Sequence, residues 1–387
     1  MAKRAAIVAA AQTKYAASRM DVSYEELVWE VVEKVTQRLN LTWADRAIKG
    51  PGIDAIVSCC EDYWDARVIS QFCIQRELGA HGMPEVKVSA DGAQAVYLAT
   101  VQILSGTYDL VLVVSHRKES ATVRSIIENA GLDPIYLRPL GLDYQVGAAL
   151  QARRYMETYG ISERQCAEAV VKNRKNGKGN PYAQLQSDIT VEEVLGSRLI
   201  ADPIKILDSK PISDGACAML IASEETALKI TDQPVWIKGI GNCYDLHNLG
   251  DRDLADCRAL ELAAKRAYAM AGIQDIRRQV DIAEISGEYS YQELMWAEGL
   301  GFCDRGKGGL LIERGEEEVG GRISLNPSGG LLSGVPCGVA GMSRVAEGFL
   351  QLRHEASGRQ VQSARTALAH GVTGCCGQAH CVIILGI

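Results

Sequence analysis

The run NPSGGLLSGVPCGVAGM, residues 326–342, decides the fold. It holds five glycines, two prolines and one cysteine, between a strand-like segment (322–325) and a helix-like segment (343–352). Glycines at this density let backbone approach backbone, or a ligand, where no side chain would fit. A second small-residue run, VSADGAQA (88–95), stands in the same setting between a predicted strand and a predicted apolar helix. We expect the two runs to face each other across one active-site pocket.

Composition narrows the class of protein. The chain has 387 residues, enough for two core-sized units, with 47% hydrophobic and 23% charged residues. The net charge of −7 argues against nucleic-acid binding as the main activity. No apolar run reaches the roughly 18 residues that a membrane span needs. These features predict a globular protein that binds neither nucleic acid nor membrane.

The twelve cysteines do not form a disulfide pattern. Two adjacent pairs occur, at 59–60 and 375–376, and the other cysteines are scattered singly without a C-x-x-C spacing. The first eleven residues are interpreted as a core strand, because their apolar part is too short for a signal peptide. We therefore expect reduced thiols in a cytoplasmic protein, and no structural metal site.

The hydrophobic pattern repeats along the chain. In the first half it predicts strands at 5–11, 53–59, 85–89 and 108–115 and helices at 23–39, 67–78 and 92–105. In the second half it predicts strands at 235–240, 280–285, 322–325 and 381–385 and helices at 255–271, 291–299 and 343–352. The same order twice indicates duplication of one α/β unit, with residues 89–92 corresponding to 327–330.

The segment between the halves is polar and interrupted by turn-forming residues, and it is predicted to be an insertion on the protein surface. The predicted domains are an N-terminal half (1–116 and 210–230), an inserted loop domain (117–209) and a C-terminal half (231–387). The insert carries the basic run VKNRKNGKGNP, which is either a solvated loop or a site for a phosphorylated ligand. Its cations are Lys172, Arg174, Lys175 and Lys178.

Several short sequence motifs together resemble those of a known protein family. They are YDLVLVV (108–114), KNRKN with the following NP (172–181), IKILD with SDGA (204–216), NPSGG (326–330) and GCCGQ (374–378). In this order they resemble the thiolase superfamily, above all its sterol-carrier-protein-x and archaeal type. The resemblance implies an α/β fold of five layers, α-β-α-β-α, built from two duplicated halves plus an inserted loop domain. It also implies a homodimer or dimer of dimers, acyl-CoA substrates with coenzyme A as substrate or product, no tightly bound cofactor, and, as in some relatives of the sterol-carrier type, a zinc-ribbon/OB-fold partner protein.

The family's catalytic positions are occupied differently here. The nucleophilic cysteine of the C-x-(S/T)-G motif corresponds to Ser89, the histidine before proline in the glycine-rich turn to Val335, and the His or Asn of a second motif to Ser286. Thiolysis needs a thiolate, and a serine hydroxyl needs an adjacent base. Three interpretations remain open: a thiolase-like acyltransferase with a replaced nucleophile, a retro-aldolase acting on a 3-hydroxyacyl-CoA, and a non-catalytic acyl-CoA-binding subunit. The acyl group is open among branched, aromatic and steroid types.

Candidate site residues follow from these positions. A thiol from Cys337 or Cys376, a base at His370, and an acid or base at Glu288 or Tyr289 would serve either chemistry. Ser89 opens a buried helix, whose N-terminus favours an oxyanion. The predicted catalytic set is Ser89, Tyr289, Cys337, His370 and Cys376, and the predicted oxyanion and backbone donors are Ser89, Asn326, Gly374 and Gly377. The four cations of the insert, Lys172, Arg174, Lys175 and Lys178, are the predicted coenzyme A-binding residues.

Overall fold

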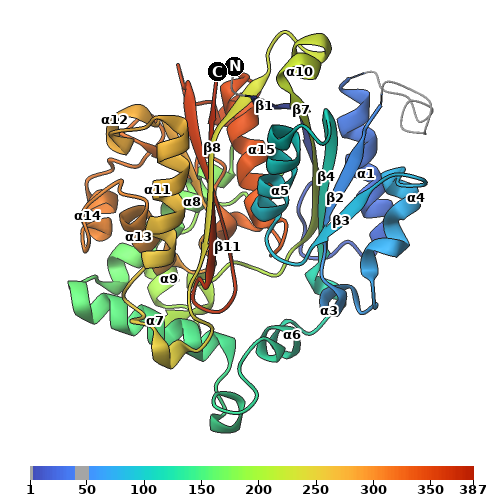
Figure 1. Ribbon diagram of the computed structural model, residues 1–387. Coiled ribbons are helices and arrows are strands. Elements are labelled where there is room, and N and C mark those ends of the chain that lie inside the picture. Colours follow the sequence, from blue (N-terminus) through green and yellow to red (C-terminus); the bar gives the residue numbers. More distant parts are fainter. Residues whose placement is uncertain (1–2, 40–51) are drawn as a thin grey trace.

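The computed structural model describes residues 3–39 and 52–387, and its centre is one ten-stranded sheet (Figure 1). The strand order is β10-β9-β11-β12-β8-β1-β7-β4-β2-β3. The first-half strands are β1 (Ala5–Gln12), β2 (Ala55–Cys59), β3 (Glu85–Val88), β4 (Leu110–Lys118) and β7 (Asp214–Ser223). The second-half strands are β8 (Val235–Tyr244), β9 (Ile282–Ile285), β10 (Ser324–Leu325), β11 (Thr366–Thr373) and β12 (Ala379–Gly386).

The two halves of the sheet repeat each other in order and direction. Counted along the chain, each half runs third, second, fourth, fifth and first strand from its outer edge to the centre. In each half the second strand is parallel to the third and fourth, and the fifth is antiparallel to the fourth and the first. The halves join where β1 pairs antiparallel with β8, Ala5 opposite Ile237. The order and direction agree with the duplicated unit that the sequence pattern indicates.

Five layers result from how the helices cover the sheet. Helices α5 (Gly92–Ser105) and α15 (Ala340–Leu352) pack on each other between the two halves, and every residue of α15 is buried. Helix α1 (Tyr24–Gln37) covers the outer face of the first half, and α11 (Arg258–Ala271) and α13 (Ser290–Gly299) cover that of the second (Figure 1). The α-β-α-β-α architecture is therefore confirmed.

The remaining helices are short or belong to the segment between the halves. Their bounds are α3 (Asp62–Asp65), α4 (Gln75–Leu78), α6 (Arg124–Ala130), α7 (Tyr144–Tyr159), α8 (Glu163–Gly177), α9 (Val191–Leu195), α10 (Glu224–Ile230), α12 (Ile276–Gln279) and α14 (Gly308–Glu313). A two-stranded sheet of β5 (Leu199–Ala201) and β6 (Ile204–Lys205) lies in the same segment. Among the described residues, no helix has the length and apolar content that crossing a bilayer requires.

Local sequence signals account for several of these elements. The helix expected at 92–105 is confirmed as α5, and the capping box of α1 is present because Ser23 accepts from the Glu26 amide while Glu26 accepts from the Ser23 amide. The helix expected at 67–78 is wrong over its first part. Ile69 has a φ of +56°, which ends any helical run there, and a 3-10 helix (Ser70–Ile74) leads into α4.

Candidate active site

A cavity of about 370 Å³ opens at the carboxyl ends of strands β2, β4, β9 and β11. Ligand sites in α/β proteins favour this edge of a sheet. Its wall comes from the segments that follow these strands, from the glycine-rich turn, and from α6 and α7. Its lining side chains include Glu61, Trp64, Arg117, Glu128, Tyr144, Glu288, Tyr289, Cys337, Cys375 and Cys376.

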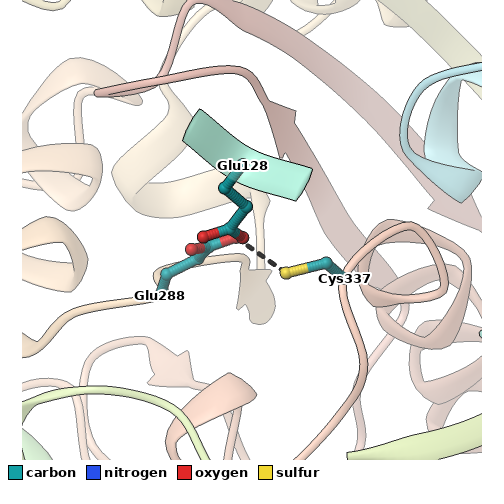
Figure 2. Close-up of side chains that lie close together, drawn as sticks. All are labelled: Glu128, Glu288 and Cys337. Carbon is teal, nitrogen blue, oxygen red and sulfur yellow. Dashed lines mark hydrogen bonds between the residues drawn. The ribbon is translucent and has the colours of Figure 1, made fainter. Parts of the chain in front are cut away.

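A thiol and two carboxylates meet in this wall (Figure 2). The Cys337 thiol donates a hydrogen bond to Glu288 Oε1, with sulfur and oxygen 3.0 Å apart. Arg124 lies behind both carboxylates: its Nη2 donates to Glu288 Oε2 at 2.7 Å and its Nε donates to Glu128 Oε1 at 2.9 Å. Glu128 Oε2 is buried and has no hydrogen-bond partner. Glu128 therefore keeps one acceptor free, while Arg124 fixes its orientation.

Burial sets the protonation of this group. Loss of solvation, together with the charge of Glu288, raises the pKa of Cys337 well above its usual range, so this thiol stays protonated and acts as a donor. Burial also raises the pKa of Glu128 to about 7, although Arg124 opposes the shift. A carboxyl that titrates near neutral pH is suited to taking up and returning a proton.

The turn that carries Cys337 is anchored from beneath by a fully buried ion pair. Lys210 Nζ lies 2.9 Å from both carboxylate oxygens of Glu119. Glu119 Oε1 also accepts from the Cys337 amide at 2.7 Å, and Oε2 accepts from the Ser213 amide at 2.9 Å. Burial alone would raise the pKa of Glu119, but Lys210 and Arg124 lower it to about 2. The carboxylate of Glu119 thus links the SDGA motif to the glycine-rich turn.

Arg117 supplies a buried positive charge to the wall beside this turn. It is 1% exposed, its guanidinium lies 4.8 Å from the centre of the Trp64 ring, and Nη1 is 3.3 Å from Glu61 Oε2. Gly338 has a φ of +76°, and a Cβ there would overlap Arg117 Nη2. Glycine is therefore required next to Cys337 so that the guanidinium can approach the turn.

Ser89 lies outside the cavity. Its side chain is exposed, it is not among the lining residues, and its hydroxyl makes a long hydrogen bond of 3.4 Å to the Cys60 carbonyl. Asp91 occupies the N-terminus of α5, where Oδ1 accepts from the Ala93 amide at 2.9 Å. The oxyanion expected at this helix end is therefore replaced by a carboxylate of the chain itself.

The two glycine-punctuated runs touch directly. The Gly92 amide donates to the Gly338 carbonyl at 2.6 Å, and Asp91 Oδ2 accepts from the Gly341 amide at 2.9 Å. The prediction that they face each other across a pocket is wrong in this respect. The cavity lies beside the contact, and Gly338, of the second run, lines it.

The basic run is largely part of the core. It forms the end of α8, where Lys172 is 6% exposed and paired with Glu293 at 2.5 Å, and Arg174 is 8% exposed. Lys175 and Lys178 reach solvent, where each pairs with a surface carboxylate, Glu318 and Asp188 respectively. The surface-loop interpretation is corrected, because the apolar face of α8 draws this run into the core. None of the four cations lines the cavity.

Other predicted residues are distributed between the cavity and the core. Tyr289, Cys376, Gly374 and Gly377 line the cavity with Cys337. The other two do not line it. His370 is fully buried, its Nε2 is 2.9 Å from His380 Nδ1, and burial keeps its pKa well below the usual range. Asn326 is held by the Ile285 amide and by Glu293, so its amide group is already used in the core.

Sequence reasoning missed several residues of the cavity wall and of the contacts that support it. Arg117 lies near the end of the buried strand β4 and Glu119 directly follows it, and charged residues in that position were a usable signal for the carboxyl edge of a sheet. Glu128 and Arg124 lie on α6, which has no buried residue, so no pattern singled them out. Within the described part of the chain, donor atoms of Glu128, Glu288 and Cys337 lie within 4.8 Å of one another, as a metal site would require. Arg124 already supplies the positive charge that these carboxylates need.

Comparisons with known proteins agree with this fold. Residues 5–225 match the family described as "Thiolase, N-terminal domain", and residues 242–387 match "Thiolase C-terminal domain-like". The chain is 31% identical to an acetyl-CoA acetyltransferase of Methanothermobacter thermautotrophicus, over 97% of both chains. It is 29% identical to sterol carrier protein 2 of Homo sapiens, over 96% of this chain and 70% of that protein. A solved structure, the Ltp2-ChsH2(DUF35) aldolase, superposes with a TM-score of 0.84 at 25% identity, covering 99% of this chain and 97% of that one. The chain therefore belongs to the thiolase family.

Proposed function

We propose that the protein cleaves or forms the carbon–carbon bond next to a coenzyme A thioester by aldol chemistry, with a 3-hydroxyacyl-CoA as the substrate of cleavage. One observation carries the proposal: Glu128, with a free carboxylate oxygen, and the buried cation Arg117 share one cavity, whereas Ser89 lies outside it. Retro-aldol cleavage needs a base for the hydroxyl and a positive group for the enolate, and no acyl-enzyme. The likeness to a solved aldolase supports the same chemistry.

The proposed steps use residues of the wall in fixed roles. Glu128 takes the proton of the 3-hydroxyl group. The bond between C2 and C3 breaks, C3 leaves as an aldehyde or ketone, and the electron pair moves into the thioester enolate. Arg117, itself buried, stabilises the negative oxygen of that enolate. Glu128 then returns its proton to C2, which releases the shortened acyl-CoA and restores the starting carboxylate.

In this scheme the Cys337 thiol serves as a hydrogen-bond donor to Glu288. Its thiol already donates to Glu288, and its pKa is raised well above the usual range by burial. A thiol in this state is a poor nucleophile. Glu288 fixes Arg124, and through Arg124 it orients Glu128.

A second candidate function is acyl transfer with Cys337 as the nucleophile. The hydrogen bond from Cys337 to Glu288 favours it, because a carboxylate beside a thiol is able to accept the thiol proton. The relative described as an acetyl-CoA acetyltransferase supports this function too. Acyl transfer requires a covalent intermediate on sulfur, which is detected as an added acyl mass on Cys337 and is lost in Cys337→Ser.

The need for free coenzyme A separates the two functions. A 3-hydroxyacyl-CoA should be cleaved without added coenzyme A, and Glu128→Gln should lower kcat/KM by about 10²–10⁴-fold. The matched control is Glu157→Gln, an exposed change on α7 away from the cavity, which should leave the rate unchanged. Turnover of a 3-oxoacyl-CoA that consumes free coenzyme A and labels Cys337 would instead establish the second candidate.

A partner protein is part of the proposal. Figure 1 shows α6 and the segment after it extending away from the body of the fold. This segment exposes large apolar side chains: Val123, Ile126, Ile135, Tyr136 and Leu140. Because exposed apolar surface often marks an interface, and the structural relative includes a DUF35 component, we expect a zinc-ribbon/OB-fold partner to bind here. Replacing Ile126 and Tyr136 by Ser should abolish co-purification with such a protein and leave the fold intact.

A further inference from the structure

We propose that Cys375 and Cys376 form a thiol–disulfide exchange site in the cavity wall. Small organic disulfides oxidise this site, and the product is a disulfide between these two adjacent cysteines. The proposal does not depend on which reaction the cavity catalyses. It concerns two residues that have no role in the steps above. Both line the cavity, so a small disulfide that enters the cavity reaches them.

The turn between β11 and β12 presents the two thiols together. Their sulfur atoms are 3.7 Å apart. Gly374, Cys376 and Gly377 have φ values of +82°, +55° and +66°, so the backbone coils tightly around the pair. A cysteine in the left-handed region is uncommon, and strained backbone of this kind concentrates at functional sites.

Side chains from helix α7 and from the segment before α11 fix the turn and leave room for sulfur. Arg252 Nη2 donates to the Cys375 carbonyl at 2.8 Å, and Gln151 Nε2 donates to the Cys376 carbonyl at 3.1 Å. On the sulfur side, a Cβ at Gly147 of α7 would lie 3.0 Å from Cys375 Sγ and 3.8 Å from Cys376 Sγ. The backbone is thus held while the thiols face a residue without a side chain.

The two thiols differ in the way that exchange requires. The hydrogen bond from Cys376, followed by the charge of Arg252, lowers the pKa of Cys375 even though burial opposes the shift. The pKa of Cys376 is raised by the same hydrogen bond and by burial. Cys375 is also the more exposed of the pair. Attack by the thiolate and resolution by a neighbouring thiol are the two steps of disulfide exchange.

The chemistry balances with the small disulfide as the oxidant. The Cys375 thiolate attacks one sulfur of the disulfide R–S–S–R, forming a mixed disulfide and releasing R–S⁻. The Cys376 thiol loses its proton and attacks the Cys375 sulfur, releasing a second R–S⁻. The two protein thiols lose two electrons, the small disulfide gains them, and the two thiol protons pass to the released R–S⁻ groups.

The product should be easily reduced again. Adjacent Cα atoms lie about 3.8 Å apart, whereas unstrained disulfides join Cα atoms about 4.4–6.8 Å apart. A disulfide between neighbours is therefore strained, and strained disulfides are the labile ones. The oxidation state of Cys375 and Cys376 consequently follows the ratio of disulfide to thiol around the protein. Because the turn lines the cavity, oxidation alters the cavity wall.

The test uses the full reduced chain and 2,2′-dithiodipyridine as the probe. Pyridine-2-thione release is followed by absorbance, and the protein is then denatured, alkylated with N-ethylmaleimide and digested with trypsin. Cleavage after Arg365 gives a C-terminal peptide, 366–387, that contains Cys375, Cys376 and Cys381. We expect both halves of each probe molecule that reacts at this peptide to be released, and the peptide to carry one alkyl group and no pyridyl group.

Three variants make the result decisive. Cys376→Ser should keep one pyridyl group on Cys375, and Cys375→Ser should slow the reaction at this peptide at least about tenfold. Cys381→Ser should release both halves of the probe as the unmodified chain does, and its peptide should carry no alkyl group and no pyridyl group. Circular dichroism checks that each variant is folded. Cys73 serves as an internal comparison, because it is more exposed and no cysteine adjoins it in the sequence. A stable pyridyl adduct on Cys375 in the unmodified chain, a linkage through Cys381, or faster reaction at Cys73 than at Cys375 would overturn the proposal.

Discussion

Cys337 and Glu119 are joined through the backbone: the Cys337 amide donates to Glu119 Oε1 at 2.7 Å, inside a site where Glu119 has no exposed surface. Glu119 is in turn paired with the equally buried Lys210. The position of the turn that carries Cys337 therefore depends on a charge pair that lies beneath the cavity wall.

Removing Lys210 should destabilise the protein strongly. Lys210→Met leaves Glu119 buried without its counter-charge, and breaking a buried pair in this way costs about 3–5 kcal/mol. Urea unfolding measures the loss. The matched control is Lys229→Met, which breaks an exposed pair with Glu225 and should change stability by less than about 0.5 kcal/mol. Similar effects of the two changes would contradict a special role for the buried pair.

Asp91 should make the fold less stable as pH rises toward neutrality. Burial raises the pKa of Asp91 to about 7, whereas an unfolded aspartate titrates near about 3.9. Between these values the folded chain holds a proton that the unfolded chain has lost. Stability from this group is thus fully present below about 3.9 and falls by up to about 1.4 kcal/mol per pH unit until about 7. Asp91→Asn should remove this slope in urea unfolding measured from pH 4 to 7, and an unchanged slope would refute the assignment.

Gly338 should tolerate no side chain, for a reason separable from its backbone angle. Gly338→Ala adds the cost of a positive φ and a collision with Arg117. Gly141 has nearly the same φ, +75°, and no atom lies within 4 Å of the place its Cβ would take, so Gly141→Ala isolates the backbone cost of about 1–2 kcal/mol. We expect Gly338→Ala to exceed the control in lost stability and to reduce turnover as well. Equal losses, measured by thermal unfolding and by the cleavage assay, would mean that Arg117 does not need this space.

Turnover should rise as pH increases through about 7. Glu128 must be ionised to accept the hydroxyl proton, and its pKa is raised to about 7 by burial. The kcat/KM of the proposed cleavage should therefore fall about tenfold for each pH unit below that value. Glu128→Gln should flatten this limb of the profile as well as lower it. A limb that persists in Glu128→Gln would place the base on another residue.

Much of the fold could be predicted from the sequence, because the signals for most of its helices and strands are local. Helix α5 carries apolar residues on most sides and a glycine C-cap at Gly106, so its bounds were predictable. Strands β7 and β11 were missed, although both are largely buried. They are rich in alanine and glycine, which have low strand propensity, and they form by long-range pairing with β4 and β9.

The site was less accessible because its geometry depends on distant contacts. The glycine-rich turn could be identified from composition, and Cys337, Cys376, Gly374, Gly377 and Tyr289 do line the cavity. No periodicity indicates that the side chain of residue 91, and not residue 89, controls the start of α5. Likewise Glu128 and Glu288 are 160 positions apart and are brought together only through Arg124.

The carboxylate of Asp91 has a consequence for the history of the duplicated chain. One oxygen accepts from an amide at the start of α5 and the other from an amide at the start of α15, so a single side chain serves both copies of the ancestral unit. Gly371, from the second copy, must lack a side chain to leave room for it. The two copies have therefore become asymmetric and mutually dependent, and a chain divided between them should fold only when both fragments are present together.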